Sequence, residues 1–108
     1  MGDHYVMDAA GTVREEPDLL AWALWFEDAD RHIGNDTVNG IQISTVFLGL
    51  DHGFPRDNEY PLVFETMLFG DEIDGEYQWR YRSIAAAREG HAKAVQMVRD
   101  GRLVEDPH

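Results

Sequence analysis

The clearest structural signal in the sequence lies in residues 38–51, which read VNGIQISTVFLGLD. Asn39-Gly40 separates two segments that contain apolar residues, and this dipeptide favours a two-residue hairpin turn because both residues tolerate a positive φ. The mostly apolar segment from Ile43 to Asp51 then predicts a long strand. We therefore expect a hairpin at Asn39-Gly40 to form the centre of a β-sheet.

Two further strands are expected on the C-terminal side of this hairpin. Residues 53–60 contain glycine and proline and predict a loop, after which residues 62–69 form another apolar run. Asp74-Gly75 closes a second turn, and residues 77–82 alternate aromatic and polar side chains with the period of a strand. The pattern predicts an antiparallel β-meander of about three to six strands over about residues 34–82.

Helices are expected on both sides of this meander. Pro17 suits the first position of a helix and Asp18 adds a favourable negative charge to its first turn, which predicts a helix over about residues 17–30. Ser83 is the predicted N-cap of a second helix over about residues 83–100, whose inward apolar stripe includes His91.

The remaining elements complete the expected fold class. A short N-terminal hairpin is predicted at residues 5–14, with Asp and Gly in its turn. No repeat or linker divides residues 1–108, so we expect a single domain. The sequence thus predicts an α+β fold in which an antiparallel meander packs with two α-helices.

Composition and charge exclude several function classes. The chain has no cysteine, which rules out disulfide scaffolds, thiol nucleophiles and thiolate metal sites. Its net charge is −12, with 17 acidic and 3 basic residues in residues 1–76 but 4 acidic and 6 basic residues after them. Such a negative field repels nucleic acids and anionic membranes. We expect a cytosolic protein that binds neither nucleic acid nor membrane directly.

Symmetric folding of the two loops predicts the register of the sheet. The predicted cross-strand pairs are Phe47 with Glu65, Thr45 with Met67, Glu65 with Tyr81, and Met67 with Trp79. This register gives the sheet two apolar faces, although an antiparallel sheet in a small monomer usually keeps one face in water. The chain is therefore expected to form a homodimer.

Glu65 and His91 are the leading candidates for chemistry. Glu65 lies in the middle of an apolar strand, where a carboxylate needs a partner, and His91 lies on the apolar stripe of the second helix. If that helix packs on the same face, the two side chains could form an acid, base or small-molecule site. The alternative is that each residue is structural. Asp51 and His52, at the end of the long strand, are further candidates.

Three aromatic residues on the last strand could form a contact surface. Tyr77, Trp79 and Tyr81 alternate with arginines, an arrangement that is also able to stack bases, but the negative field favours core or interface packing. No spacing of His and carboxylates matches a metal motif, and the chain has no phosphate loop, nucleophile elbow or dinucleotide fingerprint. We therefore expect neither a metal nor a cofactor.

Several short stretches resemble a family of small uncharacterised proteins that are encoded mostly by tailed bacteriophages and prophages. The stretches are residues 44–52 (STVFLGLDH), residues 62–69 (LVFETMLF), Asp74-Gly75-Glu76, Arg80-Tyr81 and Gly90-His91-Ala92, and the resemblance covers about residues 40–98. It implies a phage gene that is expressed in a bacterial cytoplasm, and it implies no particular activity.

Two hypotheses of different class follow. The first is a small acidic accessory protein that binds a host or phage protein and inhibits or redirects a host factor. The second is a small-molecule or metal site, or an enzyme, built around Glu65 and His91. The two differ in one geometric requirement, because the second needs Glu65 and His91 to lie within hydrogen-bond reach of each other.

Overall fold

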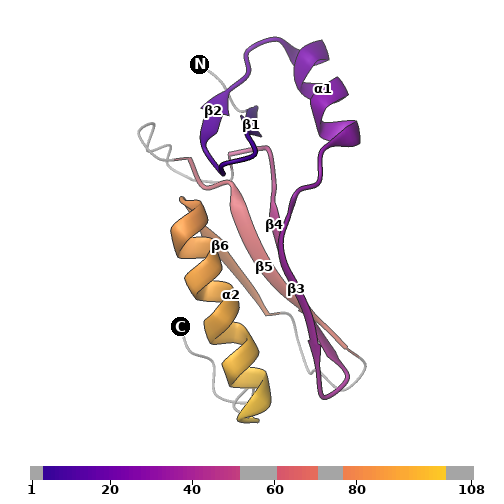
Figure 1. Cartoon of the computed structure of the whole chain (residues 1–108), viewed down its shortest axis with the longest axis vertical. Helices are drawn as coiled ribbons and strands as arrows, with labels where there is room; N and C mark the ends of the chain where they lie inside the picture. The colour runs from indigo at the N-terminus through magenta and orange to yellow at the C-terminus, as the bar shows by residue number, and fades with distance from the viewer. Residues whose placement is uncertain (1–3, 52–60, 71–76, 102–108) are drawn as a thin grey trace.

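The computed structural model describes residues 4–51, 61–70 and 77–101. It contains two helices and six strands in these ranges, and Figure 1 shows their arrangement. In chain order the elements are β1 (Tyr5–Met7), β2 (Val13–Glu15), α1 (Leu19–Asp28), β3 (His32–Val38), β4 (Ile41–Phe47), β5 (Phe64–Phe69), β6 (Gln78–Tyr81) and α2 (Ile84–Arg99). The predicted α+β fold is confirmed.

The strands form two antiparallel sheets. β1 and β2 form a two-stranded hairpin, and β3, β4, β5 and β6 form a four-stranded meander in that order. The turn between β3 and β4 lies at Asn39-Gly40, where φ is 53° for Asn39 and 80° for Gly40, so the predicted hairpin is confirmed. The edges of the larger sheet are β3 and β6.

The two helices occupy different places relative to the meander. α2 runs along one face of the four-stranded sheet and contacts all four strands, whereas α1 lies beyond the end of the sheet beside β1 (Figure 1). Only one of the two helices therefore covers the meander. Within the described ranges, neither helix combines the length and the apolar character that a bilayer crossing requires.

The start of α1 differs from the prediction by two residues. Asp18 is the N-cap rather than a residue of the first turn, because its Oδ1 accepts hydrogen bonds from the backbone N–H groups of Leu20 (3.0 Å) and Ala21 (3.2 Å). α2 begins as predicted, since the hydroxyl of Ser83 accepts a hydrogen bond from the N–H of Ala86 at 3.1 Å.

The predicted register is wrong by one residue between β4 and β5. Thr45 lies opposite Thr66 rather than Met67, and Phe47 lies opposite Phe64 rather than Glu65. The prediction continued the strand to Asp51, but β4 ends at Phe47 and the chain then takes a positive φ of 78° at Gly49. A shift of one residue moves every side chain of a strand to the other face of the sheet.

The register between β5 and β6 differs from the prediction in the same way. Glu65 lies opposite Arg80 rather than Tyr81, and Met67 lies opposite Gln78 rather than Trp79. Trp79 and Tyr81 therefore share a face with the apolar residues of β5 and not with Glu65.

These pairings give the sheet one apolar face instead of the two that were predicted. Beneath α2 the sheet contributes Ile43, Phe47, Phe64 and Leu68, which pack against Ala87, Ala94, Val95 and Val98 of the helix. The opposite face is more polar, with Ser44, Glu65, Gln78 and Arg80, and its apolar residues are Val46, Met67 and Phe69. The core therefore lies between α2 and the sheet, and the argument for a dimer from a second apolar face no longer holds.

Candidate functional site

Glu65 lies on the sheet face opposite α2 and is held by neighbours on β6. Its side chain is buried, with 7% exposure, and its Oε2 accepts a hydrogen bond from Nε of Arg80 at 2.9 Å and another from the amide of Gln78. A buried carboxylate is stable when it is paired in this way. The contacts give Glu65 a structural role, which is to tie β5 to the edge strand β6.

His91 lies on the other face, between α2 and the sheet. Its Nδ1 is 2.7 Å from the hydroxyl of Thr45 on β4, and its Nε2 is 2.7 Å from Oδ2 of Asp36 on β3. Glu65 and His91 are thus separated by the sheet, because Thr45 and Glu65 project from opposite faces. The structure does not bring the two leading candidates together.

The hydrogen bonds around His91 continue across the sheet as one chain. The hydroxyl of Thr45 is 2.5 Å from that of Thr66, which in turn accepts a hydrogen bond from the hydroxyl of Tyr81 at 3.1 Å. Five side chains from four strands and one helix are thereby connected: Tyr81, Thr66, Thr45, His91 and Asp36. Sequence reasoning missed Asp36 and both threonines, because no local pattern places them near His91.

One assignment of donors and acceptors satisfies every group of this hydrogen-bond chain. Asp36 only accepts, so Nε2 of His91 carries the proton that it shares with that carboxylate. In the uncharged imidazole Nδ1 then accepts from Thr45, and Thr45 accepts from Thr66. Tyr81 supplies the last proton to Thr66. Each proton is used once, which makes the chain a fully satisfied polar connection between α2 and the sheet.

Two glycines make room for the side chains of His91 and Tyr81 between α2 and the sheet. A Cβ on Gly34 of β3 would lie 2.7 Å from Nε2 of His91, and a Cβ on Gly90 of α2 would lie 2.3 Å from the hydroxyl oxygen of Tyr81. Both distances are far below van der Waals contact. The absence of side chains at these two positions therefore lets α2 lie close to the sheet.

Burial raises the pKa of the Tyr81 hydroxyl, and the hydrogen bond of this hydroxyl to Thr66 partly offsets that effect.

The other two candidate residues are Asp51 and His52. Oδ1 of Asp51 accepts a hydrogen bond from the backbone N–H of Leu62 at 3.0 Å, which joins the two ends of the β4–β5 connection. His52 lies outside the described residues. Among those that the structure describes, no three His, Asp or Glu side chains are grouped in a way that could hold a metal ion.

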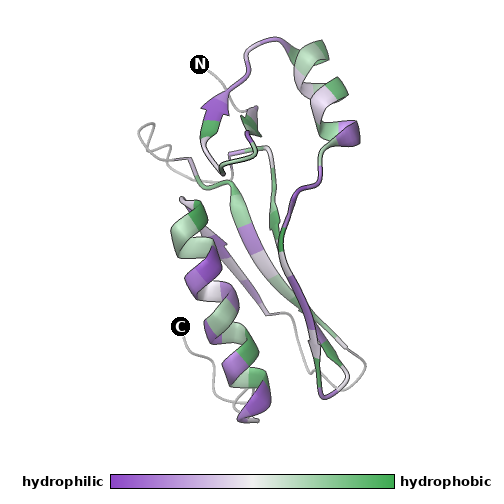
Figure 2. Ribbon diagram, viewed as in Figure 1, coloured by the Kyte–Doolittle hydropathy of each residue, from purple (hydrophilic) through white to green (hydrophobic). Residues whose placement is uncertain are grey.

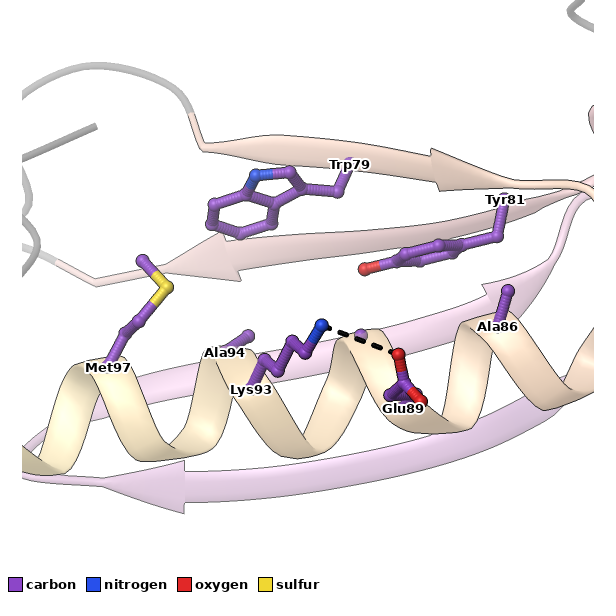
Figure 3. Close-up of a pocket in the computed structure, with 8 residues that line it drawn as sticks. Trp79, Tyr81, Ala86, Glu89, Lys93, Ala94 and Met97 are labelled. Atoms are coloured by element: carbon purple, nitrogen blue, oxygen red, sulfur yellow. Dashed lines mark ion pairs between the residues drawn. The ribbon is translucent and has the colours of Figure 1, made fainter. Parts of the chain in front are cut away.

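The aromatic residues of β6 border a pocket instead of an outer surface. Trp79 and Tyr81 face α2 across a cavity of about 320 Å³, which we call the α2–β6 pocket (Figure 3). Its remaining lining comes from α2: Ala86, Glu89, Gly90, Lys93, Ala94 and Met97. Lys93 and Glu89 form an ion pair of 3.3 Å at one side of the cavity. The predicted contact residue Tyr77 stacks on Trp79, with ring centroids 6.2 Å apart.

The apolar residues of α1 are divided between two faces. The aromatic face holds the helix in place, because Nε1 of Trp22 donates to the carbonyl oxygens of Tyr5 (3.0 Å) and Gly49 (3.2 Å), and the ring of Trp25 packs edge-on against Phe47. The guanidinium of Arg31 lies 3.9 Å from the centroid of the Phe26 ring. These contacts fix one side of the helix only.

The other side of α1 exposes leucines. Leu19, Leu20 and Leu24 have exposed fractions of 59%, 68% and 59%, and the helix has no fully buried residue. Leu20 and Leu24 are four apart and therefore lie next to each other on the helix, and we call the surface that they form the leucine face. Leu19 is exposed at the start of the helix beside it. Figure 2 shows apolar residues around α1, whereas α2 alternates apolar and polar residues. The sequence indicated a broad apolar stripe here, but not which part of it would stay exposed.

Acidic residues lie before and after α1 in the sequence and at both of its ends. Residues 14–32 contain six carboxylates and two arginines, and the carboxylates lie on both sides of the helix: Glu15, Glu16 and Asp18 before it or at its cap, and Glu27, Asp28 and Asp30 at its end or after it. The backbone and the ring of His32 hydrogen-bond to Asp30 and lower the pKa of its carboxyl. An exposed apolar surface with a polar rim is typical of a protein interaction site.

No protein-family model, curated protein or solved structure matches the chain.

Proposed function

We propose that this protein acts by protein–protein interaction and that α1 is its contact helix. The supporting observation is the leucine face, because three of the five large exposed apolar residues in the described ranges lie on this one short helix. Exposed leucines spaced along a helix are the elements that dock in an apolar groove of a partner. The helix needs no rearrangement to do this, since its aromatic face already anchors it.

The charge around α1 indicates the chemistry of the partner. The six carboxylates of residues 14–32, the segment that contains α1, favour a groove that is bordered by lysine and arginine. The resemblance to phage-encoded proteins supports a host or phage protein in a bacterial cytoplasm as this partner, which the small acidic protein inhibits or redirects. We further propose that the chain associates with itself as a homodimer or larger homo-oligomer.

A capture experiment from bacterial lysate tests the role of α1. The bait is the full chain, and the comparison is the Leu20→Gln, Leu24→Gln double variant. Burial of a leucine side chain contributes about 1.5–3 kcal/mol, so loss of both weakens binding by roughly a hundredfold or more. The captured protein is then purified and its affinity for each variant is measured by calorimetry.

The matched control removes two exposed apolar residues elsewhere, in the Leu50→Gln, Phe69→Gln variant. We expect this control to bind like the wild type. The proposal fails if the wild type captures only itself at low and high salt, or if the control and the α1 variant lose the partner equally.

A further inference from the structure

The α2–β6 pocket combines apolar walls with one hydroxyl group. Trp79, Tyr81, Ala94 and Met97 supply aromatic and aliphatic surface. The volume of about 320 Å³ lies at the lower end of the range of about 300–1,000 Å³ that ligand sites in proteins span. Figure 3 shows the hydroxyl of Tyr81 directed into the space between β6 and α2. These walls suit a small aromatic molecule with one polar group.

The charged side chains that line the pocket already form a pair. Lys93 and Glu89 interact at 3.3 Å on the outer side of α2, so the two charges compensate each other. An uncharged ligand leaves this pair intact. The other lining residues from α2 offer no N–H or O–H group on their side chains: Ala86, Gly90, Ala94 and Met97. The hydroxyl of Tyr81 is therefore the group that can select a ligand by its hydrogen bonding.

The direction of this hydroxyl is determined at the far edge of the sheet, by Asp36 on β3. A carboxylate only accepts, so Nε2 of the uncharged His91 ring donates to Asp36 and Nδ1 accepts from Thr45. The proton of Thr66 is then used on Thr45, and Tyr81 donates its own proton to Thr66. The oxygen of Tyr81 thus presents only lone pairs to the pocket, where it can accept a hydrogen bond but not donate one.

We propose that the α2–β6 pocket binds a small uncharged aromatic molecule that donates one hydrogen bond to the oxygen of Tyr81, and that Asp36 and His91 set this preference for a donor. Tyr81 touches the ligand in this arrangement. Asp36 and His91 act through Thr45 and Thr66, so they are positioning residues. The site does not involve α1, and the inference is therefore independent of the proposed contact helix.

Protonation of His91 reverses the direction of the hydrogen-bond chain. Both nitrogens of an imidazolium donate, so Nε2 keeps Asp36 while Nδ1 donates to Thr45. Thr45 then donates to Thr66, and Thr66 donates to Tyr81. The proton of Tyr81 is released toward the pocket, which no longer prefers a donor. Histidine side chains change charge in the range of about pH 5–8, so pH provides a way to reverse the chain.

The groups around the imidazole come from the sheet and from α2 itself. Asp36 contacts Nε2 from β3, and Thr45 contacts Nδ1 from β4. The strands β5 and β6 reach the ring only through the hydroxyls of the chain. On α2, Arg88 lies about one turn before His91. A proton that His91 takes up therefore enters the chain at Nδ1.

Two probes of the same shape test the preference for a donor. Indole has an N–H group that donates, whereas benzofuran has the same fused rings without a donor. The Kd of each probe for the full chain is measured from the amide chemical shifts of Gly90 and Ala94. Where His91 is uncharged, we expect indole to bind roughly two- to tenfold more tightly, which is the contribution of one hydrogen bond. In Tyr81→Phe the two probes should bind equally.

The positioning role of Asp36 and His91 needs a separate readout. As the pH falls from about 8 to about 5, the advantage of indole should decrease in proportion to the protonated fraction of His91, which the nitrogen shifts of its imidazole measure in the same samples. Asp36→Asn gives Nε2 a partner that can also donate, so the chain can reverse and the advantage should decrease at about pH 8. The control Asp100→Asn removes the same charge from an exposed position outside the pocket and should keep the wild-type advantage.

Several results would overturn the proposal. If neither probe shifts the amides of the α2–β6 pocket, or if the shifts are confined to α1, the pocket is not a binding site. Equal affinities of both probes for the wild type with uncharged His91 exclude Tyr81 as the acceptor, as does an advantage of indole that persists in Tyr81→Phe. An advantage that responds neither to the protonation of His91 nor to Asp36→Asn shows that these residues do not set the preference.

Discussion

Both helices of this protein contain many apolar residues, mainly leucine and aromatic residues in α1 and alanine and valine in α2, but they use them differently. α2 buries five residues against the sheet, namely Ala87, Ala94, Val95, Met97 and Val98, whereas α1 buries none. In α2 the valines and Met97 follow one stripe that the sheet covers, and among the apolar residues only alanines stay exposed on the other side of the helix. In α1 they surround the helix, and one contact surface covers only the aromatic part. The spacing of apolar residues, more than their number, separates the structural helix from the one that is available for binding.

The largest expected effect comes from comparing the loss of a core side chain beneath α2 with the loss of an exposed side chain on α1. Phe64→Ala, in the core under α2, is expected to reduce the free energy of unfolding by about 3–5 kcal/mol. Leu20→Ala on the leucine face is expected to change it by no more than about 0.5 kcal/mol. Urea denaturation of dilute protein measures both values. A large loss for Leu20→Ala would show that the leucine face is covered in solution.

A second test concerns the close approach of α2 to β3. In Gly34→Ala the new methyl group meets the imidazole of His91, whose Nε2 lies 2.7 Å from the Cβ position, and we expect a loss of about 1–3 kcal/mol. In a His91→Ala background the same change should be nearly neutral, because the obstacle is gone. Equal losses in both backgrounds would mean that Gly34 is needed for another reason.

Local signals predicted the secondary structure well because they depend on few residues. Asn39-Gly40 fixed a turn that needs two positive φ values, and Ser83 fixed the start of α2. The register of the strands was not predictable in the same way, since it depends on where β4 ends and on a loop that the sequence describes only as polar. The unexpected end at Phe47 reversed the faces and separated Glu65 from His91.

The candidate site was predictable only in part for the same reason. His91 was correctly placed on the inward stripe of α2, but its partners come from two strands that are far away in the sequence. Asp36 lies on an edge strand with mainly polar residues, where nothing local marks it as a partner. The leucine face was hidden because an apolar helix is normally expected to be covered, and the sequence does not show which side remains open.

The helix caps provide a smaller test of the difference between the helices. Asp18→Ala and Ser83→Ala each remove a side-chain hydrogen-bond acceptor at a helix start, which costs about 1 kcal/mol. Ser83→Ala should lower the global stability by this amount. Asp18→Ala should instead raise amide hydrogen exchange within α1 by about fivefold and leave the core protected, since α1 has no buried residue. Equal global losses would show that α1 unfolds together with the core.

The smallest expected effect is a pH dependence from Tyr81. Burial raises its folded-state pKa above the unfolded value near 10, so folding favours the neutral phenol. This contribution is fully present below pH about 10 and is lost as the pH rises through the folded-state pKa. Thermal unfolding between about pH 9 and pH 11 should therefore show a steeper decline for the wild type than for Tyr81→Phe. Identical profiles would mean that Tyr81 is solvated.

The threonine pair in the middle of the sheet also affects which strand alignments are possible. A slip of two residues between β4 and β5 would keep every apolar side chain under α2 and would be the least costly misalignment for burial alone. It would, however, place Thr45 opposite Phe64 or Leu68 instead of Thr66, and the two buried hydroxyls would no longer form a hydrogen bond with each other. Thr45 would keep His91 and Thr66 would keep Tyr81, but the hydroxyl proton of Thr66 would lose its acceptor, and a buried donor left unsatisfied costs about 1–3 kcal/mol. The threonine pair thus favours the native register of β4 and β5 over slipped registers that bury the same apolar side chains.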